Sequence, residues 1–212
     1  MLLATGLTAR LGGREILHGV DFEARPGQIT AIVGPNGSGK TTLLRRLTGD
    51  LAGGGAISLE GERLADLAPR ALARRRAVLP QASTLGFPFT LREVVAMGHQ
   101  AGAAAHLPGV VEAALAEVGL GAKAERFFQD MSGGEQARGH LARVRAQVWE
   151  PVSAGRPAWL FVDEPVAALD IGHQLQVMGV LRRFARAGGG VVAVMHDLNL
   201  TAMHAGAMVL ME

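Results

Sequence analysis

The sequence predicts an α/β fold, in which a parallel sheet forms the core and a helical subdomain is inserted into it. Three short apolar runs, at residues 28–33, 159–162 and 191–195, predict strands buried on both faces. Polar residues follow each run, and ligands bind outside the carboxyl ends of parallel strands, so these ends predict one shared site. Between residues 90 and 147, apolar residues recur at three- and four-residue spacings, which predicts the inserted helices.

Length and composition fit one compact domain. The chain has 212 residues, of which 49% are hydrophobic and 19% charged, and this excludes a disordered chain. We assign 1–212 to a single domain, with its core at about 1–86 and 151–212 and the helical subdomain at about 87–150. The net charge of +2 gives no indication of nucleic-acid binding. No apolar run has the length of a membrane span, so we expect a soluble, untranslocated chain.

The first predicted strand leads into a glycine-rich motif that fits G-x-x-x-x-G-K-[ST] and opens a predicted helix. The backbone amides of such a loop close around phosphate oxygens, Lys40 reaches the β- and γ-phosphates, and Thr41 ligates Mg²⁺. An incidental glycine-rich turn is the alternative, and the full spacing disfavours it. The predicted ligand residues of this phosphate-binding loop are Gly34, Pro35, Asn36, Gly37, Ser38, Gly39, Lys40, Thr41 and Thr42.

Two carboxylates follow the second predicted strand. Asp163 can hold Mg²⁺ and Glu164 can polarise an attacking water, which are the two tasks that phosphoryl transfer leaves to acidic side chains. A strand that ends in Asp-Glu is by itself usually a solvated turn. The pair becomes a strong indication only together with the phosphate-binding loop.

Residues 132–136, here called the signature segment, precede a predicted helix with Leu141 and Val144 on one face. Ser132 and Glu135 have the spacing of a capping box, which is the simplest interpretation of both. Two successive glycines each cost a helix about 1 kcal/mol relative to alanine. A close approach of another group to that backbone would explain them.

Together, these motifs resemble the ATP-binding subunits of ABC transporters over essentially the whole chain. The resemblance rests on the phosphate-binding loop, Gln81, the signature segment, residues 163–164, residues 168–170 and His196, in this order. It implies a Mg²⁺-dependent ATPase that forms a homodimer, with two copies paired head to tail and each ATP lying between the phosphate-binding loop of one copy and the signature segment of the other. The residues implied on that opposite side are Ser132, Gly133, Gly134 and Glu135.

The same resemblance implies roles for single residues. Gln81 would contact the metal and the lytic water, His196 would hold the γ-phosphate, and Asp170 would contact the opposite subunit. Taken alone, His196 would be a satisfied histidine at a strand end and Gln81 a surface amide, so both depend on the set. Leu11 stands where relatives carry an aromatic residue that stacks on adenine. We expect Leu11 to cover the base and to distinguish ATP from GTP weakly; the alternative is a core position.

Within the family, the stretch from Gln81 to Gly98 and residues 170–174 and 196–200 resemble importers of iron chelates, in particular hemin-import subunits. This implies integral membrane permease subunits as partners, a periplasmic binding protein indirectly, no nucleic acid, and a peripheral location at the cytoplasmic face of the inner membrane. The alternatives are an importer of a siderophore or vitamin B12, a soluble ABC-type ATPase of DNA repair or translation, and a regulatory subunit that binds ATP without hydrolysing it. A P-loop kinase or GTPase is a further alternative, and the signature segment counts against it because neither class of enzyme needs that segment.

Several positions depart from the family pattern. Val166-Ala167 replaces Thr-Ser, Gly139 interrupts the signature helix, and Arg145 falls on the apolar face of that helix. We expect these changes to affect stability or activity. Residues 206–207 replace Asp-Arg, and relatives continue beyond Glu212. The basic run at 74–76 is predicted to be a solvated helix face.

Overall fold

The computed structural model describes residues 1–81, 86–167 and 169–212 and confirms the predicted α/β fold. A parallel five-stranded sheet has the order β11-β3-β10-β9-β6, and an antiparallel four-stranded sheet has the order β2-β1-β4-β5. A short β7-β8 hairpin stands apart from both. The strands are β1 (Leu2–Leu11), β2 (Arg14–Ala24), β3 (Ile29–Val33), β4 (Ala56–Leu59), β5 (Glu62–Arg63), β6 (Arg76–Leu79), β7 (Val152–Ser153), β8 (Arg156–Pro157), β9 (Trp159–Asp163), β10 (Gly190–Val194) and β11 (Ala207–Leu210).

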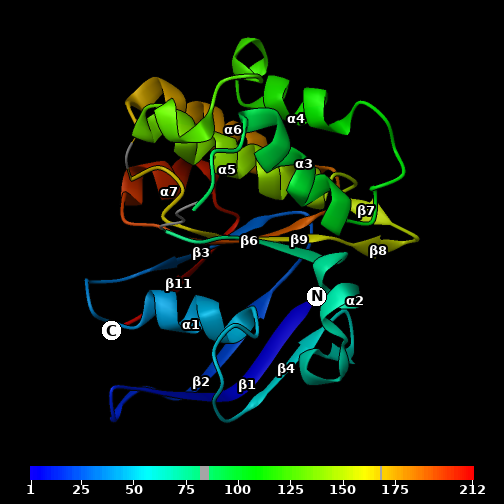
Figure 1. Cartoon of the computed structure of the whole chain (residues 1–212). Helices are drawn as coiled ribbons and strands as arrows, with labels where there is room; N and C mark the ends of the chain where they lie inside the picture. Colours follow the sequence, from blue (N-terminus) through cyan, green and yellow to red (C-terminus); the bar gives the residue numbers. More distant parts are fainter. Residues whose placement is uncertain (82–85, 168) are drawn as a thin grey trace.

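The helices form two groups around the parallel sheet (Figure 1). One group covers one face of the sheet, and α1 lies on the other face, between the two sheets. No helix in the described ranges is long and apolar enough to cross a membrane. The helices are α1 (Lys40–Leu47), η1 (Leu64–Asp66), α2 (Pro69–Ala73), α3 (Leu91–Ala101), α4 (Val110–Glu117), η2 (Gly121–Lys123), η3 (Phe128–Asp130), α5 (Gly133–Gln147), α6 (Ile171–Arg186) and α7 (Leu198–His204).

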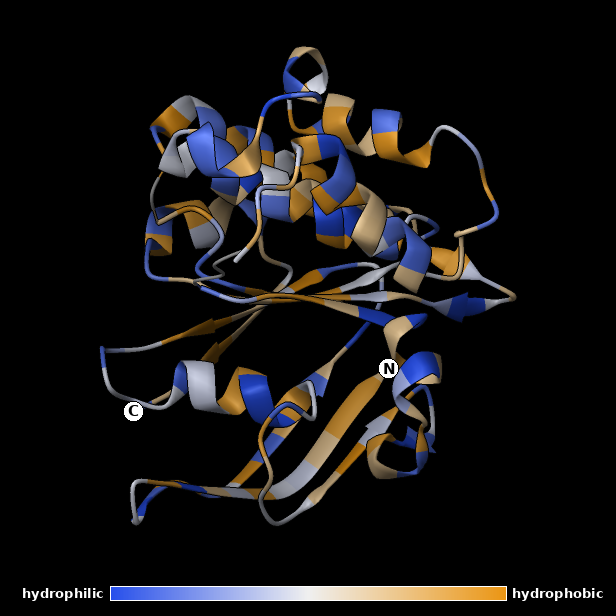
Figure 2. Cartoon of the chain, viewed as in Figure 1, coloured by the Kyte–Doolittle hydropathy of each residue, from blue (hydrophilic) through white to orange (hydrophobic). Residues whose placement is uncertain are grey.

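The central strands are apolar throughout because both faces of the parallel sheet are buried. In β9, Leu160 and Val162 face the core shared with α3 to α6, whereas Trp159 and Phe161 face the core shared with α1 and the antiparallel sheet. Figure 2 shows hydrophobic residues on α1 and along β1, which close this second core. The predicted apolar runs therefore fold as the three middle strands of the sheet.

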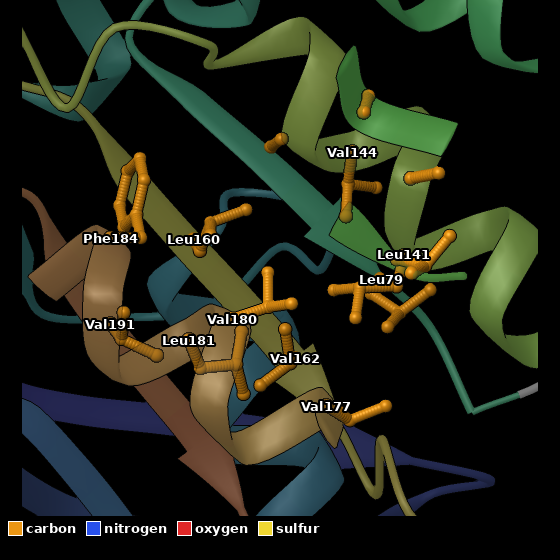
Figure 3. Packing of buried hydrophobic residues seen from close by; sticks show 14 of the residues in the cluster. Leu79, Leu141, Val144, Leu160, Val162, Val177, Val180, Leu181, Phe184 and Val191 are labelled. Atoms are coloured by element: carbon orange, nitrogen blue, oxygen red, sulfur yellow. The ribbon is translucent and has the colours of Figure 1, made fainter. Parts of the chain in front are cut away.

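The core under the helices is built from interlocking apolar side chains of α5, α6 and the sheet (Figure 3). Val180 and Leu181 of α6 lie against the strands, and Leu160 and Val162 of β9 are fully buried among them. Phe184 extends the same cluster. This packing fixes the end of β9, from which the catalytic carboxylates are expected to project.

Two departures from the family pattern have structural explanations. A Cβ at position 139 would lie 2.8 Å from atoms of Leu91 and Phe128, so Gly139 permits a close approach of neighbouring elements. The buried Arg145 donates from Nε to Glu117 at 3.1 Å and lies 4.6 Å over the Trp149 ring. Burial lowers the pKa of Arg145, and the Glu117 carboxylate opposes that shift. The arginine on the apolar face is therefore a paired charge.

The interpretation of residues 74–76 as a solvated helix face is wrong. The helix α2 ends at Ala73, and Arg76 begins β6. Arg75 Nη1 donates to Glu62 at 2.9 Å. Arg76 Nη2 donates to Asp50 at 3.3 Å. The basic run thus enters the sheet, and two of its side chains are held by carboxylates.

Candidate functional site

The predicted catalytic residues meet at one edge of the parallel sheet. The phosphate-binding loop follows β3, His196 follows β10, Glu164 follows β9, and Gln81 follows β6. Because β3, β10, β9 and β6 are neighbours in this order, their carboxyl ends lie side by side. A cavity of about 600 Å³ opens there, and its lining residues are Leu11, Ile16, Asn36, Gly37, Gly39, Lys40, Thr41, Thr42, Gln81, Glu164 and His196.

The phosphate-binding loop requires glycine for two different reasons. Gly39 caps α1 with a φ of 92°, in the left-handed region that side chains rarely adopt. At Gly34, a Cβ would overlap the backbone carbonyl oxygen of Met211. The loop is therefore shaped both by its own backbone and by the chain that follows β11.

Lys40 and Ser38 provide polar groups inside the loop. Lys40 is 6% exposed, and its Nζ donates to the carbonyl oxygens of Gly34 at 2.9 Å and Pro35 at 2.8 Å. The hydroxyl of Ser38 is buried and has no hydrogen-bond partner among the described residues. Lys40, at the N-terminus of a helix and lining the cavity, fits the oxygens of a phosphate group, whereas Ser38 is not among the residues that line the cavity.

Two oxygen atoms that could ligate a metal ion meet at the first turn of α1, one from Thr41 and one from Asp163. Thr41 Oγ1 donates to Asp163 Oδ1 at 3.2 Å, which joins the phosphate-binding loop to the end of β9. Asp163 is 4% exposed, and burial raises the pKa of its carboxyl group while the Thr41 hydrogen bond opposes the shift. A hydroxyl and a carboxylate at this spacing suit a hard cation such as Mg²⁺.

Glu164 has a strained backbone conformation, and two side chains contact its carboxylate. Its φ of 50° lies in the left-handed region, which costs a non-glycine residue of order 1–3 kcal/mol. Gln81 Nε2 donates to Glu164 Oε2 at 3.0 Å, and His196 Nε2 contacts Glu164 Oε1. The Glu164 amide donates to the carbonyl of Val194 at 3.2 Å. The Glu164 carboxylate is thus fixed between the side-chain amide of Gln81 and the imidazole of His196.

The apolar end of the cavity is formed by the β1–β2 hairpin. Leu11 ends β1, lines the cavity and is 39% exposed, so it is not a core residue. Ile16 lies beside it, and a Cβ on Gly39 would be 3.1 Å from Ile16 Cγ2. Ile16 was not among the residues predicted from the sequence. The signal was the Gly12-Gly13 turn, which brings residues on its two sides together.

The signature segment does not line this cavity. Ser132 and Glu135 form the predicted capping box of α5, with the Ser132 amide donating to Glu135 at 2.9 Å. Lys123 pairs with Glu135 and, as the largest cause, lowers the pKa of that carboxyl group to about 2. A Cβ at Gly133 would meet open space, so no described part of this chain closes on the glycine.

Asp170 also lies outside the cavity. It caps α6 through a hydrogen bond from the His173 amide at 2.9 Å, and its other oxygen contacts the His173 ring at 2.7 Å. The backbone hydrogen bond from His173 is the main reason why the pKa of Asp170 is lowered. Ala168, which belongs to the same predicted motif, lies outside the described residues.

The sequence has close relatives among curated proteins. A protein of Jannaschia sp. (strain CCS1), named "Hemin import ATP-binding protein HmuV", is 57% identical over 211 residues, covering 100% of this chain and 78% of the relative. A protein of the same name from Mesorhizobium japonicum is 54% identical over 216 residues, covering 100% of this chain and 82% of the relative.

Solved structures share the fold. The structure of an ATP-binding subunit of an ABC transporter matches with a TM-score of 0.86 at 24% identity, covering 100% of this chain and 86% of that chain. A nucleotide-free ATP-binding cassette from an ABC transporter matches with a TM-score of 0.81 at 20% identity, covering 100% and 87%. The profile of the ABC transporter family matches residues 17–167. With more than half of its length matched, the chain belongs to the ABC transporter family.

Proposed function

We propose that this chain is the Mg²⁺-dependent ATP-hydrolysing subunit of an importer that takes up heme or a related iron chelate through a membrane permease. The observation that carries the ATPase assignment is the Glu164 carboxylate, held by Gln81 and His196 at the mouth of the phosphate-binding loop. An orienting amide, a carboxylate and an imidazole beside a phosphate site can position the attacking water and stabilise the transferring phosphoryl group.

The residues of the loop fit a triphosphate and its metal. Lys40 and the backbone amides of the loop, that of Ser38 included, would hold the phosphates. Thr41, Asp163 and Gln81 would hold Mg²⁺, which supplies positive charge against the oxygens of the β- and γ-phosphates. Leu11 and Ile16 would cover the base with aliphatic carbon.

Hydrolysis then depends on Glu164. Its carboxylate accepts a hydrogen bond from the attacking water and draws the water proton as the oxygen approaches phosphorus. Gln81 Nε2, which already donates to this carboxylate, keeps it oriented. His196 leaves Glu164 to donate from Nε2 to the γ-phosphate, and positive charge from Lys40 stabilises the transferring group.

The site is complete only in a homodimer. The capped N-terminus of α5 offers amide groups and an open Gly133, yet it stands away from the phosphate-binding loop of its own chain. The phosphates of an ATP molecule bound to the loop of a second copy would complement that helix end. By the resemblance to the family, Asp170 would also contact the opposite copy.

Heme is the proposed cargo because relatives at 57% and 54% identity are named hemin import proteins. The chain would then act at the cytoplasmic face of the inner membrane, bound to permease subunits that receive cargo from a periplasmic binding protein. Its partners are proteins and not nucleic acid.

The Glu164→Gln variant tests the ATPase assignment. The glutamine retains an oxygen that can accept the Gln81 hydrogen bond but loses the charge that activates water, so ATP binding persists and turnover falls by about 10²-fold or more. Phosphate release and nucleotide binding are measured on the same preparation. Hydrolysis at the parent rate would overturn the role of Glu164.

Reconstitution with the cognate permease tests the cargo. ATPase activity should rise when a heme-loaded binding protein is added and stay unchanged with the heme-free protein. Stimulation by a siderophore or vitamin B12 alone would refute heme while leaving the ATPase assignment intact.

A further inference from the structure

A second cavity, of about 610 Å³, lies at the opposite end of α1 from the cavity beside the phosphate-binding loop. It is formed by the end of α1 and the loop after it, β4, η1, α2 and the start of β6. Five larger apolar side chains line it, those of Leu51, Ile57, Leu64, Leu67 and Leu72. The proposed ATPase mechanism uses none of these residues.

Three guanidinium groups and no carboxylate line this cavity among the described residues. They belong to Arg46, Arg63 and Arg76. A concave site of this volume, apolar with a few polar groups of one sign, has the form of a site for a small organic ligand. The sign of the charge selects an anion.

Arg46 is a buried cation whose hydrogen-bond partners in the described residues are carbonyl oxygens and not carboxylates. It is 6% exposed, and its Nη atoms donate to the carbonyl oxygens of Leu51 at 2.7 Å and Gly54 at 2.8 Å. Its Nε is buried and has no hydrogen-bond partner there. Buried charges in proteins are ordinarily paired, and its neutral carbonyl partners leave the positive charge of Arg46 without a counterion in the described residues.

Arg76 is paired with a carboxylate, but part of its guanidinium group has no hydrogen-bond partner among the described residues. Its Nη2 reaches Asp50 at 3.3 Å, but that carboxylate also accepts a hydrogen bond from Thr48 at 2.7 Å. Its Nε is buried without a partner in the described part of the chain. Burial lowers the pKa of Arg76, and Asp50 opposes the shift. Two unpartnered Nε atoms therefore belong to arginines that line the same cavity.

We propose that this cavity binds a small organic anion, a phosphate ester or carboxylate with an apolar group attached, through Arg46, Arg63 and Arg76. Planar guanidinium groups suit both kinds of head group. The apolar part of the ligand lies against Leu64 and Leu72. The proposal does not depend on ATP hydrolysis or on the cargo.

Calorimetric titration of the full chain tests the site, with n-octyl phosphate, octanol and inorganic phosphate as probes. One octyl phosphate binds per chain, and saturating adenylyl imidodiphosphate leaves its affinity unchanged. Octanol and inorganic phosphate each bind about tenfold more weakly or worse, because each lacks one half of the recognition. Competition by the nucleotide analogue, several equivalents bound, or equal binding of octanol would each overturn the proposal.

Variants locate the probe. Arg46→Gln and Arg76→Gln each weaken octyl phosphate binding by about tenfold, whereas Arg70→Gln, on the exposed part of α2 outside the cavity, does not. Because Arg46 also holds the loop at 51–54, Ala65→Trp provides a second test. Ala65 is exposed and lines the cavity, so tryptophan blocks it without entering the core. An Ala65→Trp protein with parent melting temperature and parent binding would overturn the site.

Discussion

At the first turn of α5, the Glu135 carboxylate accepts a hydrogen bond from the amide of Ser132 and pairs with Lys123 from η2. The negative charge of Glu135 would oppose an anion at the N-terminus of this helix. Lys123 offsets that charge from a neighbouring segment. The ion pair therefore keeps a capping carboxylate in place at a helix end that is proposed to face phosphate.

Replacing Lys123 by methionine should raise the pKa of Glu135 from about 2 toward the ordinary value of 4.5, because Lys123 is the main cause of its depression. A depressed pKa contributes stability above pH 4.5, and that contribution is lost as pH falls toward about 2. The variant should lose less stability across this window. Carboxyl NMR titration measures the pKa, with Lys123→Arg as the control that keeps it low. An unchanged pKa in Lys123→Met would contradict this account.

At the scale of elements, α3 and α5 are in backbone contact at two glycines, Gly98 within α3 and Gly102 at its C-cap. A Cβ at Gly98 would overlap the carbonyl oxygen of Arg143, and one at Gly102 would overlap that of Gln147. Both pairs are four residues apart, so they repeat on one side of each helix. The orientation of α5, and with it the place of the signature segment, depends on this close approach.

The variant Gly98→Ala should destabilise the protein by about 1–3 kcal/mol, because the added methyl group forces α3 away from α5. Gly179→Ala is the matched control in α6, where the added Cβ would lie 3.4 Å from the flexible end of Arg183. There alanine should stabilise by about 0.5–1 kcal/mol through its helix propensity. Urea unfolding measures both. If Gly98→Ala stabilised the protein as Gly179→Ala does, the backbone contact between α3 and α5 would not restrict the side chain at position 98.

For the whole molecule, the signature segment lies apart from the phosphate-binding loop of its own chain. A complementation experiment tests whether a second copy brings the two together. Lys40→Ala removes the loop function, and Ser132→Arg blocks the signature segment, so neither homodimer retains a complete site. Their mixture forms heterodimers in which the intact loop of one subunit meets the intact signature segment of the other.

Mixing inactive Lys40→Ala and Ser132→Arg subunits should therefore restore ATP hydrolysis, at up to about half of the parent rate per heterodimer, since one of two sites is complete. Phosphate release measures the rate. Mixing Lys40→Ala with Thr41→Ala is the control and should restore nothing, because both loops are defective. No recovery in the first mixture, with heterodimers present, would exclude the head-to-tail arrangement.

The sequence by itself determined the parallel core and most of the candidate site. The phosphate-binding loop and the capping box at Ser132 are local patterns, so neighbouring residues are sufficient to specify them. The carboxylates at 163–164 and the histidine at 196 follow apolar strands, and strand ends converge for any order of parallel neighbours. Their convergence around Glu164 was predictable for this reason, while their catalytic roles stay predictions.

Only the tertiary structure decided which distant residues touch. From the sequence, Arg145 is a charge on an apolar helix face, and the structure shows that Glu117 pairs with it. From the sequence, Gly139 interrupts a helix, and the structure shows that Leu91 and Phe128 pack closely against it. No motif marks the cavity at Arg46, and the Gly12-Gly13 turn brings Ile16 toward Leu11 without showing that Ile16 lines a cavity. Contacts between segments far apart in the chain depend on how whole elements pack, and packing follows from side-chain volume in three dimensions, which no periodicity along the sequence records.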